Sequence, residues 1–255
     1  MRIGYDATGA VLTMTQNGKT VSVTQDSTKN FAVPSLITAN GFNTAFNWNG
    51  ALNLNTQTGP NSDVVTFNYD TGARPSRTYS PYGAYTDYTY QFLTTPWTTT
   101  ATTNGRWVKT TVDGFGRTVK TETGDGSGTK SVVDTEYAPC ACSPMGKLKR
   151  VSQPHLVGGT VYWTTYTYDA RGRTLSVVAA DGASTTTYVY SATNDSVSMT
   201  DPAGKTKTMT MDALGNLTQV VEPNPAGGTF TTSYTYDLLN RLTLVSMPRG
   251  ASAQT

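Results

Sequence analysis

A short recurring motif limits the possible folds of this chain more than any other feature of its sequence. An aromatic or apolar residue is followed by Asp, two variable residues, Gly or Asn, and often Arg. The clearest copies begin at Tyr168 and Tyr236, and near copies begin at Tyr5, Tyr69, Val112 and Met211. Such self-similarity is typical of repeat proteins, in which each unit packs against its neighbours in the chain.

Degenerate copies of the motif fill the gaps between the clear ones. They begin at Trp48, Tyr90, Tyr137 and Tyr190. The second residue of successive copies falls at 49, 70, 91, 113, 138, 169, 191, 212 and 237. The sequence therefore predicts one array over residues 1–255, with roughly eleven units of about 21–25 residues. A weak unit lies near 25–46, and an inserted loop lies near 138–160.

Each unit is expected to be a β-hairpin. Residues 174–178 nearly alternate apolar and polar side chains, and residues 186–190 form a matching segment after Asp181-Gly182. Alternation of period two is typical of a half-buried strand, and Asp-Gly or Asn-Gly favours a two-residue hairpin turn. Similar turns are predicted at Asn17-Gly18, Asn49-Gly50, Asn104-Gly105 and Asp125-Gly126, and a turn with Pro in second place at Asp201-Pro202-Ala203-Gly204.

The Asp of the motif is expected to organise a turn. Its carboxylate can accept hydrogen bonds from backbone N–H groups two residues on, and the following Gly supplies a left-handed conformation. We therefore expect positive φ at Gly172 and Gly215. Tyr pairs two residues apart share one face of a strand, so we expect them to form an aromatic ladder. These pairs are Tyr88/Tyr90, Tyr166/Tyr168, Tyr188/Tyr190 and Tyr234/Tyr236.

Composition supports the same fold class. About one residue in five is Thr, and Tyr, with 15 copies, is the main aromatic residue. Thr, Val and Tyr favour a pleated sheet, whereas Gly, Thr and Pro interrupt every candidate helix. The chain is predicted to be all-β, built from tandem antiparallel hairpins, and long enough to bury a sizeable core.

Charge and hydropathy argue against two classes of partner. The 19 Lys and Arg residues are scattered, and with 17 Asp and Glu the net charge is +2. Nucleic-acid binders usually concentrate positive charge, so no nucleic-acid partner is expected. The densest cluster, residues 147–150, is interpreted as a solvated strand end rather than a phosphate-binding patch. No apolar run is long enough for a membrane span.

Two segments resemble chemical sites and are given structural interpretations. Residues 124–131 resemble a phosphate-binding loop, but Thr129 precedes Lys130 where the motif requires Gly, and a strand pattern follows. This segment is predicted to be a hairpin tip. Cys140 and Cys142 are expected to be packed or free thiols, with a metal site shared with a partner, or a disulfide, as alternatives.

Catalytic chemistry finds little support in the sequence. The chain has one His, His155, which leaves few options for a nucleophile–base pair and cannot complete a four-ligand Cys/His site. We predict no enzyme, no catalytic residues, and no cofactor or metal. Four Trp residues could instead stack on sugars if exposed, which makes an adhesive or glycan-binding module the alternative function. They are Trp48, Trp97, Trp107 and Trp163.

The repeated Tyr-Asp-x-x-Gly-Arg motifs and their hairpins resemble the YD-repeat family, also called RHS repeats. That family includes bacterial polymorphic toxins, shell subunits of insecticidal toxin complexes, and the teneurins of animals. The resemblance covers nearly the whole chain and is densest over residues 68–250. It implies a curved or spiralling sheet of stacked hairpins. Long arrays of this kind close into a shell around a toxic C-terminal segment.

The resemblance also implies a function and a location. The chain is expected to be a structural scaffold, part of a β-shell that encapsulates or presents a toxin or effector, on a secreted or cell-surface protein. Expected partners are the rest of a parent repeat protein, other copies of the chain, and an encapsulated toxin. Both ends fall inside repeats, which suggests a piece of a longer protein. Asp201-Pro202 lies in an ordinary repeat turn, so self-cleavage is not implied, and eleven units are few for a closed shell.

Overall fold

The computed structural model describes residues 2–192, 195–249 and 252–254. These residues are all-β apart from one 3₁₀ helix, η1 (Ser27–Lys29). The chain divides into two compact units, residues 1–117 with 121–130, and residues 118–120 with 131–255. The residues of β12 (Thr118–Asp125) and β13 (Gly128–Cys140) are shared between the two units.

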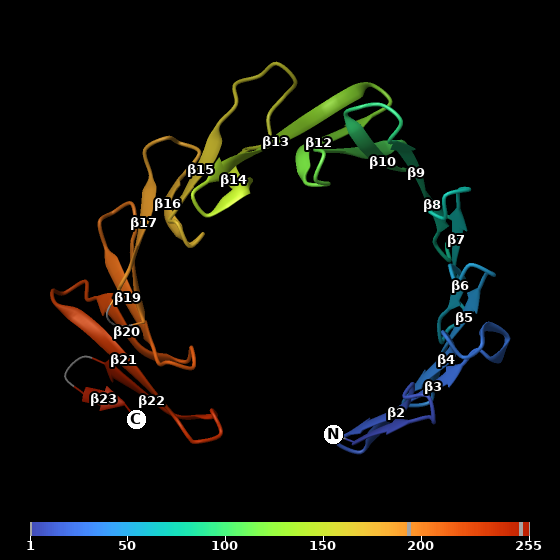
Figure 1. Ribbon diagram of the computed structural model, residues 1–255, viewed down its shortest axis with the longest axis horizontal. Helices are drawn as coiled ribbons and strands as arrows, with labels where there is room; N and C mark the ends of the chain where they lie inside the picture. The colour runs from blue at the N-terminus through green and yellow to red at the C-terminus, as the bar shows by residue number, and fades with distance from the viewer. Residues whose placement is uncertain (1, 193–194, 250–251, 255) are drawn as a thin grey trace. The chain divides into compact units, whose positions relative to one another are not determined.

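The first unit contains eleven strands that follow one another along the chain (Figure 1). They are β1 (Arg2–Tyr5), β2 (Val11–Gln16), β3 (Lys19–Gln25), β4 (Pro34–Ala39), β5 (Phe42–Trp48), β6 (Leu54–Thr58), β7 (Val64–Tyr69), β8 (Pro75–Tyr79), β9 (Tyr85–Gln91), β10 (Trp97–Thr103) and β11 (Arg106–Val112). From β1 to β11, each strand pairs in antiparallel fashion with the next one in the chain.

The second unit repeats this arrangement. Its strands after β13 are β14 (Ser143–Ser152), β15 (Trp163–Tyr168), β16 (Thr174–Val178), β17 (Thr185–Tyr190), β18 (Ser196–Thr200), β19 (Thr206–Met211), β20 (Leu217–Pro223), β21 (Thr229–Tyr236), β22 (Leu242–Arg249) and β23 (Ser252–Gln254). All the pairings are antiparallel and join neighbours in the chain. The predicted fold of tandem antiparallel hairpins is therefore confirmed within each unit.

Side-chain hydroxyls link neighbouring strands across the sheet. Thr167 and Ser176 lie opposite each other with their hydroxyl oxygens 2.7 Å apart, and Thr200 and Thr206 are similarly joined at 2.9 Å. Opposed pairs of this kind stabilise a sheet by about 0.2–1 kcal/mol each. The abundance of Thr therefore has a local role in strand pairing as well as a general β propensity.

The expected sizeable core is absent from the described residues. Only two apolar residues, Val132 and Val220, are buried. The chain exposes 16366 Å², whereas even two separate compact halves of this mass would expose about 13,000 Å² together. The prediction from length was wrong because each unit is one layer of sheet, and a side chain on a single layer keeps one side open to solvent.

Two kinds of turn connect the strands. Two-residue turns with positive φ at both residues occur at Asn17-Gly18 and Asn104-Gly105, as predicted, and also at Asn40-Gly41. The second kind begins with the Asp of the motif and has its left-handed residue three positions later. Gly172 (φ 81°) and Gly215 (φ 86°) occupy that position, which confirms the prediction for both.

Three predicted two-residue turns were wrong. Asn49 begins a turn of the Asp kind, with positive φ at Leu52 rather than at Gly50. After Asp125 the left-handed residue is Gly128, and in the loop around Asp181 only Gly182 has positive φ. In each case the side chain of Asn49, Asp125 or Asp181 accepts backbone N–H groups ahead of it, which favours the longer turn.

The left-handed position can be tested at Gly172. A Cβ there would meet no atom closer than 3.5 Å, so the backbone conformation alone determines the effect of a substitution. We expect Gly172→Val to destabilise by more than about 1–2 kcal/mol, because a β-branched residue is strained at positive φ. Gly172→Asn should cost only a few tenths of a kcal/mol (~0.3), because Asn tolerates this region and Asn240 occupies it here. Urea unfolding of both variants is the measurement, and equal midpoints for the two would contradict the assignment.

Candidate functional site

The Asp of each motif closes its turn through four hydrogen bonds. In the Asp169 turn, Oδ1 accepts the backbone N–H groups of Arg171 and Arg173, both at 2.9 Å. The Asp169 N–H donates to the Arg173 carbonyl, and the Gly172 N–H donates to the Asp169 carbonyl. The same pattern recurs in turns that begin at Asp6, Asn49, Asp70, Asp113, Asp201, Asp212 and Asp237.

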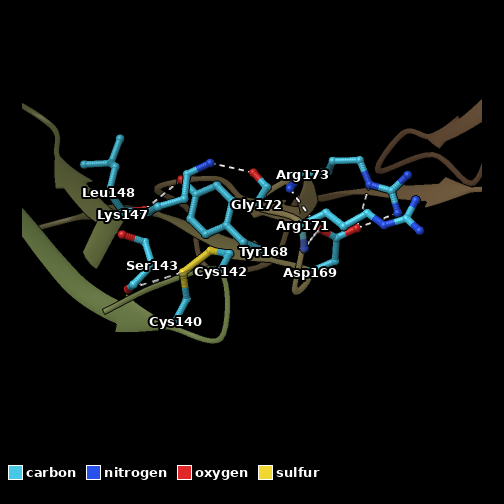
Figure 2. Close-up of a disulfide and its surroundings, with 10 residues drawn as sticks. All are labelled: Cys140, Cys142, Ser143, Lys147, Leu148, Tyr168, Asp169, Arg171, Gly172 and Arg173. Carbon is cyan, nitrogen blue, oxygen red and sulfur yellow. Dashed lines mark hydrogen bonds and ion pairs between the residues drawn. A yellow bond between two sulfur atoms is a disulfide. The ribbon is translucent and has the colours of Figure 1, made fainter. Parts of the chain in front are cut away.

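The Arg that ends the motif binds the second carboxylate oxygen. Both Nε and Nη2 of Arg173 lie 2.7 Å from Asp169 Oδ2 (Figure 2). The same ion pair joins Arg74, Arg117 and Arg241 to the Asp four residues earlier. Hydrogen bonds to a carboxylate favour its charged form. The side-chain hydrogen bond from Arg74 therefore holds the pKa of Asp70 below its usual value, with a further contribution from the Arg74 backbone N–H.

The aromatic residue of the motif binds the preceding repeat. The Tyr190 hydroxyl donates to the Thr174 carbonyl at 3.0 Å, and Thr174 is the first residue after the Asp169 turn. Equivalent bonds run from Tyr69 to Leu54, Tyr90 to Pro75, Tyr168 to Leu148 and Tyr236 to Leu217, and the Trp48 indole N–H donates to Pro34. Each accepting residue begins a strand, except Leu148, which lies within β14.

A cation covers several of these rings. The Arg173 guanidinium lies 4.1 Å from the centre of the Tyr190 ring, and Arg74 lies 4.7 Å from that of Tyr90. One series of contacts therefore runs from Asp169 through Arg173 to Tyr190 in the next repeat. We call the Tyr hydroxyl bond and the cation above the ring the inter-repeat contact. The predicted aromatic ladder was wrong in this respect: among the described residues the ring-to-ring contacts do not join the predicted Tyr pairs to one another, and a cation from the preceding turn covers the ring of Tyr90, Tyr168 and Tyr190 instead.

Cys140 and Cys142 form a disulfide, so the expectation of free or packed thiols was wrong. Their Cα atoms are 5.1 Å apart, within the range that a disulfide requires. The chain reverses between β13 and β14 at this point, and the reversal brings residues two apart closer than an extended strand would. From sequence the disulfide is only an alternative, because a bond between residues two apart is expected to be strained.

The disulfide lies in an enlarged version of the Asp turn. Tyr137 pairs with Leu148 across residues 138–147, as Tyr168 pairs with Thr174 across residues 169–173. Ala138 stands where Asp is usual. The left-handed position is nevertheless kept by Gly146 (φ 86°). Lys147 follows it in the place of Arg, 4.3 Å from the centre of the Tyr168 ring (Figure 2).

The other residues that the sequence singled out for possible chemistry make contacts with neighbouring strands. His155 Nε2 lies 3.0 Å from Asp134 Oδ2, and its backbone pairs with Val132. Residues 124–131 form the predicted hairpin tip, made of the end of β12, the turn after Asp125 and the start of β13, with no helix. In the basic cluster, Arg150 and Lys149 both pair with Glu136, and Lys147 also donates to the Gly172 carbonyl. Within the described residues, no group of three or more His, Cys, Asp or Glu could hold a metal ion.

All four Trp residues contact neighbouring residues, and Trp97 does so through the Phe92 ring. The Trp48 and Trp107 indoles donate to the Pro34 and Asp125 carbonyls, and Arg150 covers the Trp163 ring at 4.1 Å. Trp97 is the most open of them, with 36% of its surface exposed. Neither the ion pair of the motif Arg nor the hydroxyl bond of the aromatic residue was predicted. The four-residue spacing of Asp and Arg was a signal for the ion pair.

Comparison with known proteins agrees with this geometry. Residues 150–254 match the family model of the Teneurin YD-shell. No curated protein matches the sequence. The crystal structure of TcdB2-TccC3 is similar over 94% of this chain, with 15% identity and a TM-score of 0.68. The structure of TcdB2-TccC3 without its hypervariable C-terminal region matches over 94%, with 13% identity and a TM-score of 0.69.

These findings confirm the resemblance to YD-repeat shells. The family match covers the second unit from Arg150 onwards, and the structural match extends the same fold to almost the whole chain. The chain spans only 16% and 18% of the lengths of the two structures.

The hydroxyl bond of the inter-repeat contact can be measured at Tyr190. Tyr190→Phe removes the donor to the Thr174 carbonyl and keeps the ring beneath Arg173, so we expect a loss of about 0.5–1.5 kcal/mol. Tyr188→Phe is the matched control, since Tyr188 lies on the same strand, two residues earlier, and has no side-chain hydrogen bond among the described residues. Chemical denaturation of both variants is the measurement. A loss as large for Tyr188→Phe as for Tyr190→Phe would contradict the assignment.

The Asp turns predict how stability depends on pH. The pKa values of Asp70, Asp113 and Asp212 are lowered in the folded chain, chiefly by side-chain hydrogen bonds from the residue four positions later. The unfolded chain therefore binds protons first as pH falls. The stabilisation is complete above the unfolded value of about 4 and is lost as pH falls through the lower folded values. Thermal melts should change little between about pH 6 and pH 5 and fall steeply below about pH 4.

Asp169→Asn separates the two roles of the carboxylate. One oxygen accepts backbone N–H groups, and the other pairs with the Arg173 side chain. Burial raises the pKa of Asp169, but the backbone and side-chain hydrogen bonds of Arg173 outweigh it and leave the pKa lowered. Asn keeps the backbone acceptor, as Asn49 does. We expect this variant to be less stable than wild type near neutral pH and to converge with it in acid. Asp169→Ala, which loses both roles, should remain less stable throughout.

Proposed function

We propose that this chain is a structural scaffold, a segment of the wall of a YD-type β-shell. The observation that carries the proposal is the inter-repeat contact, which joins the Asp turn of one repeat to the aromatic residue of the next. A repeat array is stabilised by such nearest-neighbour contacts. The Asp, Arg and Tyr side chains of the motif, which are also common catalytic groups, therefore stabilise the sheet. The similarity to TcdB2-TccC3 and the Teneurin YD-shell supports the same function.

The scaffold is proposed to enclose or present a toxin or effector. Support comes from the fold shared with TcdB2-TccC3 and from the single-layer sheet, which buries little of its own surface. A wall of this kind can enclose a second polypeptide without a core of its own. We propose, on the same basis, that residues 1–255 form one array of about eleven units, that the chain is not an enzyme, and that it acts outside the cell or at its surface. None of the described helices has the length and hydropathy of a membrane span.

A glycan array distinguishes the scaffold function from the glycan-binding alternative. A scaffold predicts no reproducible ligand on a glycan array, for wild type and for Trp97→Ala alike. Trp97 is chosen because it is the most exposed of the four Trp residues. A ligand whose binding is lost in Trp97→Ala, and kept in the control Trp48→Phe, would favour the adhesive function instead.

A direct test is electron cryo-microscopy of the complete gene product. We expect residues 1–255 to lie in the wall of an enclosed compartment. A location outside any wall, with the sheet decorating another domain, would overturn the proposal.

A further inference from the structure

The hairpin at residues 138–147 is held by its backbone ladder, and the disulfide at its tip adds little to that. Ala138 pairs with Lys147, and Cys140 pairs with Ser143. The disulfide joins Cys140 to Cys142, only two positions later. Closing so short a loop removes little conformational freedom from the unfolded chain, so the bond stabilises the fold less than one that closes a long loop. The hairpin can therefore keep its place when this bond opens.

The disulfide can be reached from solvent. Cys140 and Cys142 are both half-buried, and Ala141 between them is exposed. Structural disulfides resist reduction, whereas exposed ones exchange more readily with external thiols. The position of this bond at a hairpin tip is therefore typical of a reactive disulfide.

The two sulfur atoms have different surroundings. A Cβ atom at Gly172 would lie 3.6 Å from Cys142 Cβ and 3.9 Å from Cys142 Sγ, so Cys142 packs against the 169–173 turn. Figure 2 shows Cys142 on the side of Tyr168 and Gly172, with the Cys140 sulfur farther from both. Cys140 is therefore the sulfur that an incoming group meets first.

A cation lies close to Cys142. The same Cβ position at Gly172 is 3.5 Å from Lys147 Nζ, which donates to the Gly172 carbonyl. Lys147 has no carboxylate partner among the described residues, and the Asp169 carboxylate of the adjoining turn is already paired with Arg173. The ammonium and the Cys142 sulfur thus border the same small space. A neighbouring ammonium stabilises a thiolate, which makes Cys142 the better leaving group of the two cysteines.

We propose that Cys140 and Cys142 form a thiol–disulfide exchange site that takes a small external thiol onto Cys140. The incoming thiolate attacks Cys140 Sγ and forms a new sulfur–sulfur bond there. The bond between Cys140 and Cys142 breaks, and its electron pair leaves with Cys142 as a thiolate beside Lys147. A second external thiolate then attacks the sulfur of the first and releases Cys140. The two external thiols end as a disulfide, and both cysteines end reduced.

The first test uses the oxidised whole chain with reduced glutathione as the probe, quenched with N-ethylmaleimide at successive times. We expect a mixed disulfide with glutathione on Cys140 and the maleimide on Cys142. Tandem mass spectrometry of the peptide that holds both cysteines distinguishes the two positions by fragmentation around Ala141. An adduct mainly on Cys142, or exchange only in chain unfolded by urea, would overturn the proposal.

The second test concerns Lys147. Lys147→Gln should slow the exchange about 2- to 10-fold, because the leaving thiolate loses its neighbouring cation. Lys147→Arg keeps the charge and should keep the rate. Lys149→Gln is the matched control, since it removes an equal charge from the same strand beside Glu136 and should leave the rate unchanged. Equal rates for wild type and a folded Lys147→Gln would overturn the assigned direction of exchange.

The third test asks whether the disulfide is structural instead. The double variant Cys140→Ser with Cys142→Ser should keep a urea midpoint close to that of wild type, because the backbone pairs of the hairpin remain. Wild type treated with a reductant should show the same midpoint as the double variant. A large loss in both would assign the bond to the fold and overturn its role as an exchange site.

Discussion

The hydrogen bond from a motif aromatic residue to the carbonyl that follows the preceding turn is the contact on which the rest of this structure depends. A single-layer sheet has little core to fix one hairpin against the next, and only Val132 and Val220 are buried apolar residues in the described part of the chain. Backbone ladders alone tolerate a slip of register. The Tyr190 hydroxyl removes that freedom, because it reaches the Thr174 carbonyl in one register only. Side chains at the turns therefore set the alignment that a core provides in compact folds.

The Asp turn prepares this contact before the next strand arrives. Asp169 fixes the path of the chain through its backbone acceptor and fixes Arg173 through its second oxygen. The guanidinium is thereby held at the position from which it covers Tyr190. Because its geometry is already set by the ion pair, less side-chain entropy is lost when the ring binds. Asp and Arg of the motif thus stabilise the turn of one hairpin and also attach that hairpin to the next.

The hairpins and turns that recur along the chain could be predicted from sequence. The contacts between successive repeats could not. Regular Tyr-Asp spacing predicted the hairpins, the turns at Asp169 and Asp212, and the positive φ of Gly172 and Gly215. The acceptor of each Tyr hydroxyl is a backbone carbonyl, which has no sequence signature. Position also overrode residue preference, since Ala73 adopts φ 58° where Gly is usual. Here the Asp70 network determines the conformation of a residue that would avoid it elsewhere.

The turn at residues 138–147 shows which part of the motif the fold requires. It lacks the Asp and is twice as long as the Asp169 turn; Ala138 pairs with Lys147 and Cys140 with Ser143, and the Cys140–Cys142 disulfide lies at its tip. Even so, Lys147 covers Tyr168, and the Tyr168 hydroxyl donates to the Leu148 carbonyl at 2.8 Å. A longer hairpin has replaced the Asp turn and still presents the cation and the carbonyl to Tyr168. What persists through this substitution is the carbonyl that accepts the Tyr168 hydroxyl and the cation above the Tyr168 ring. The Asp turn is one means of presenting them.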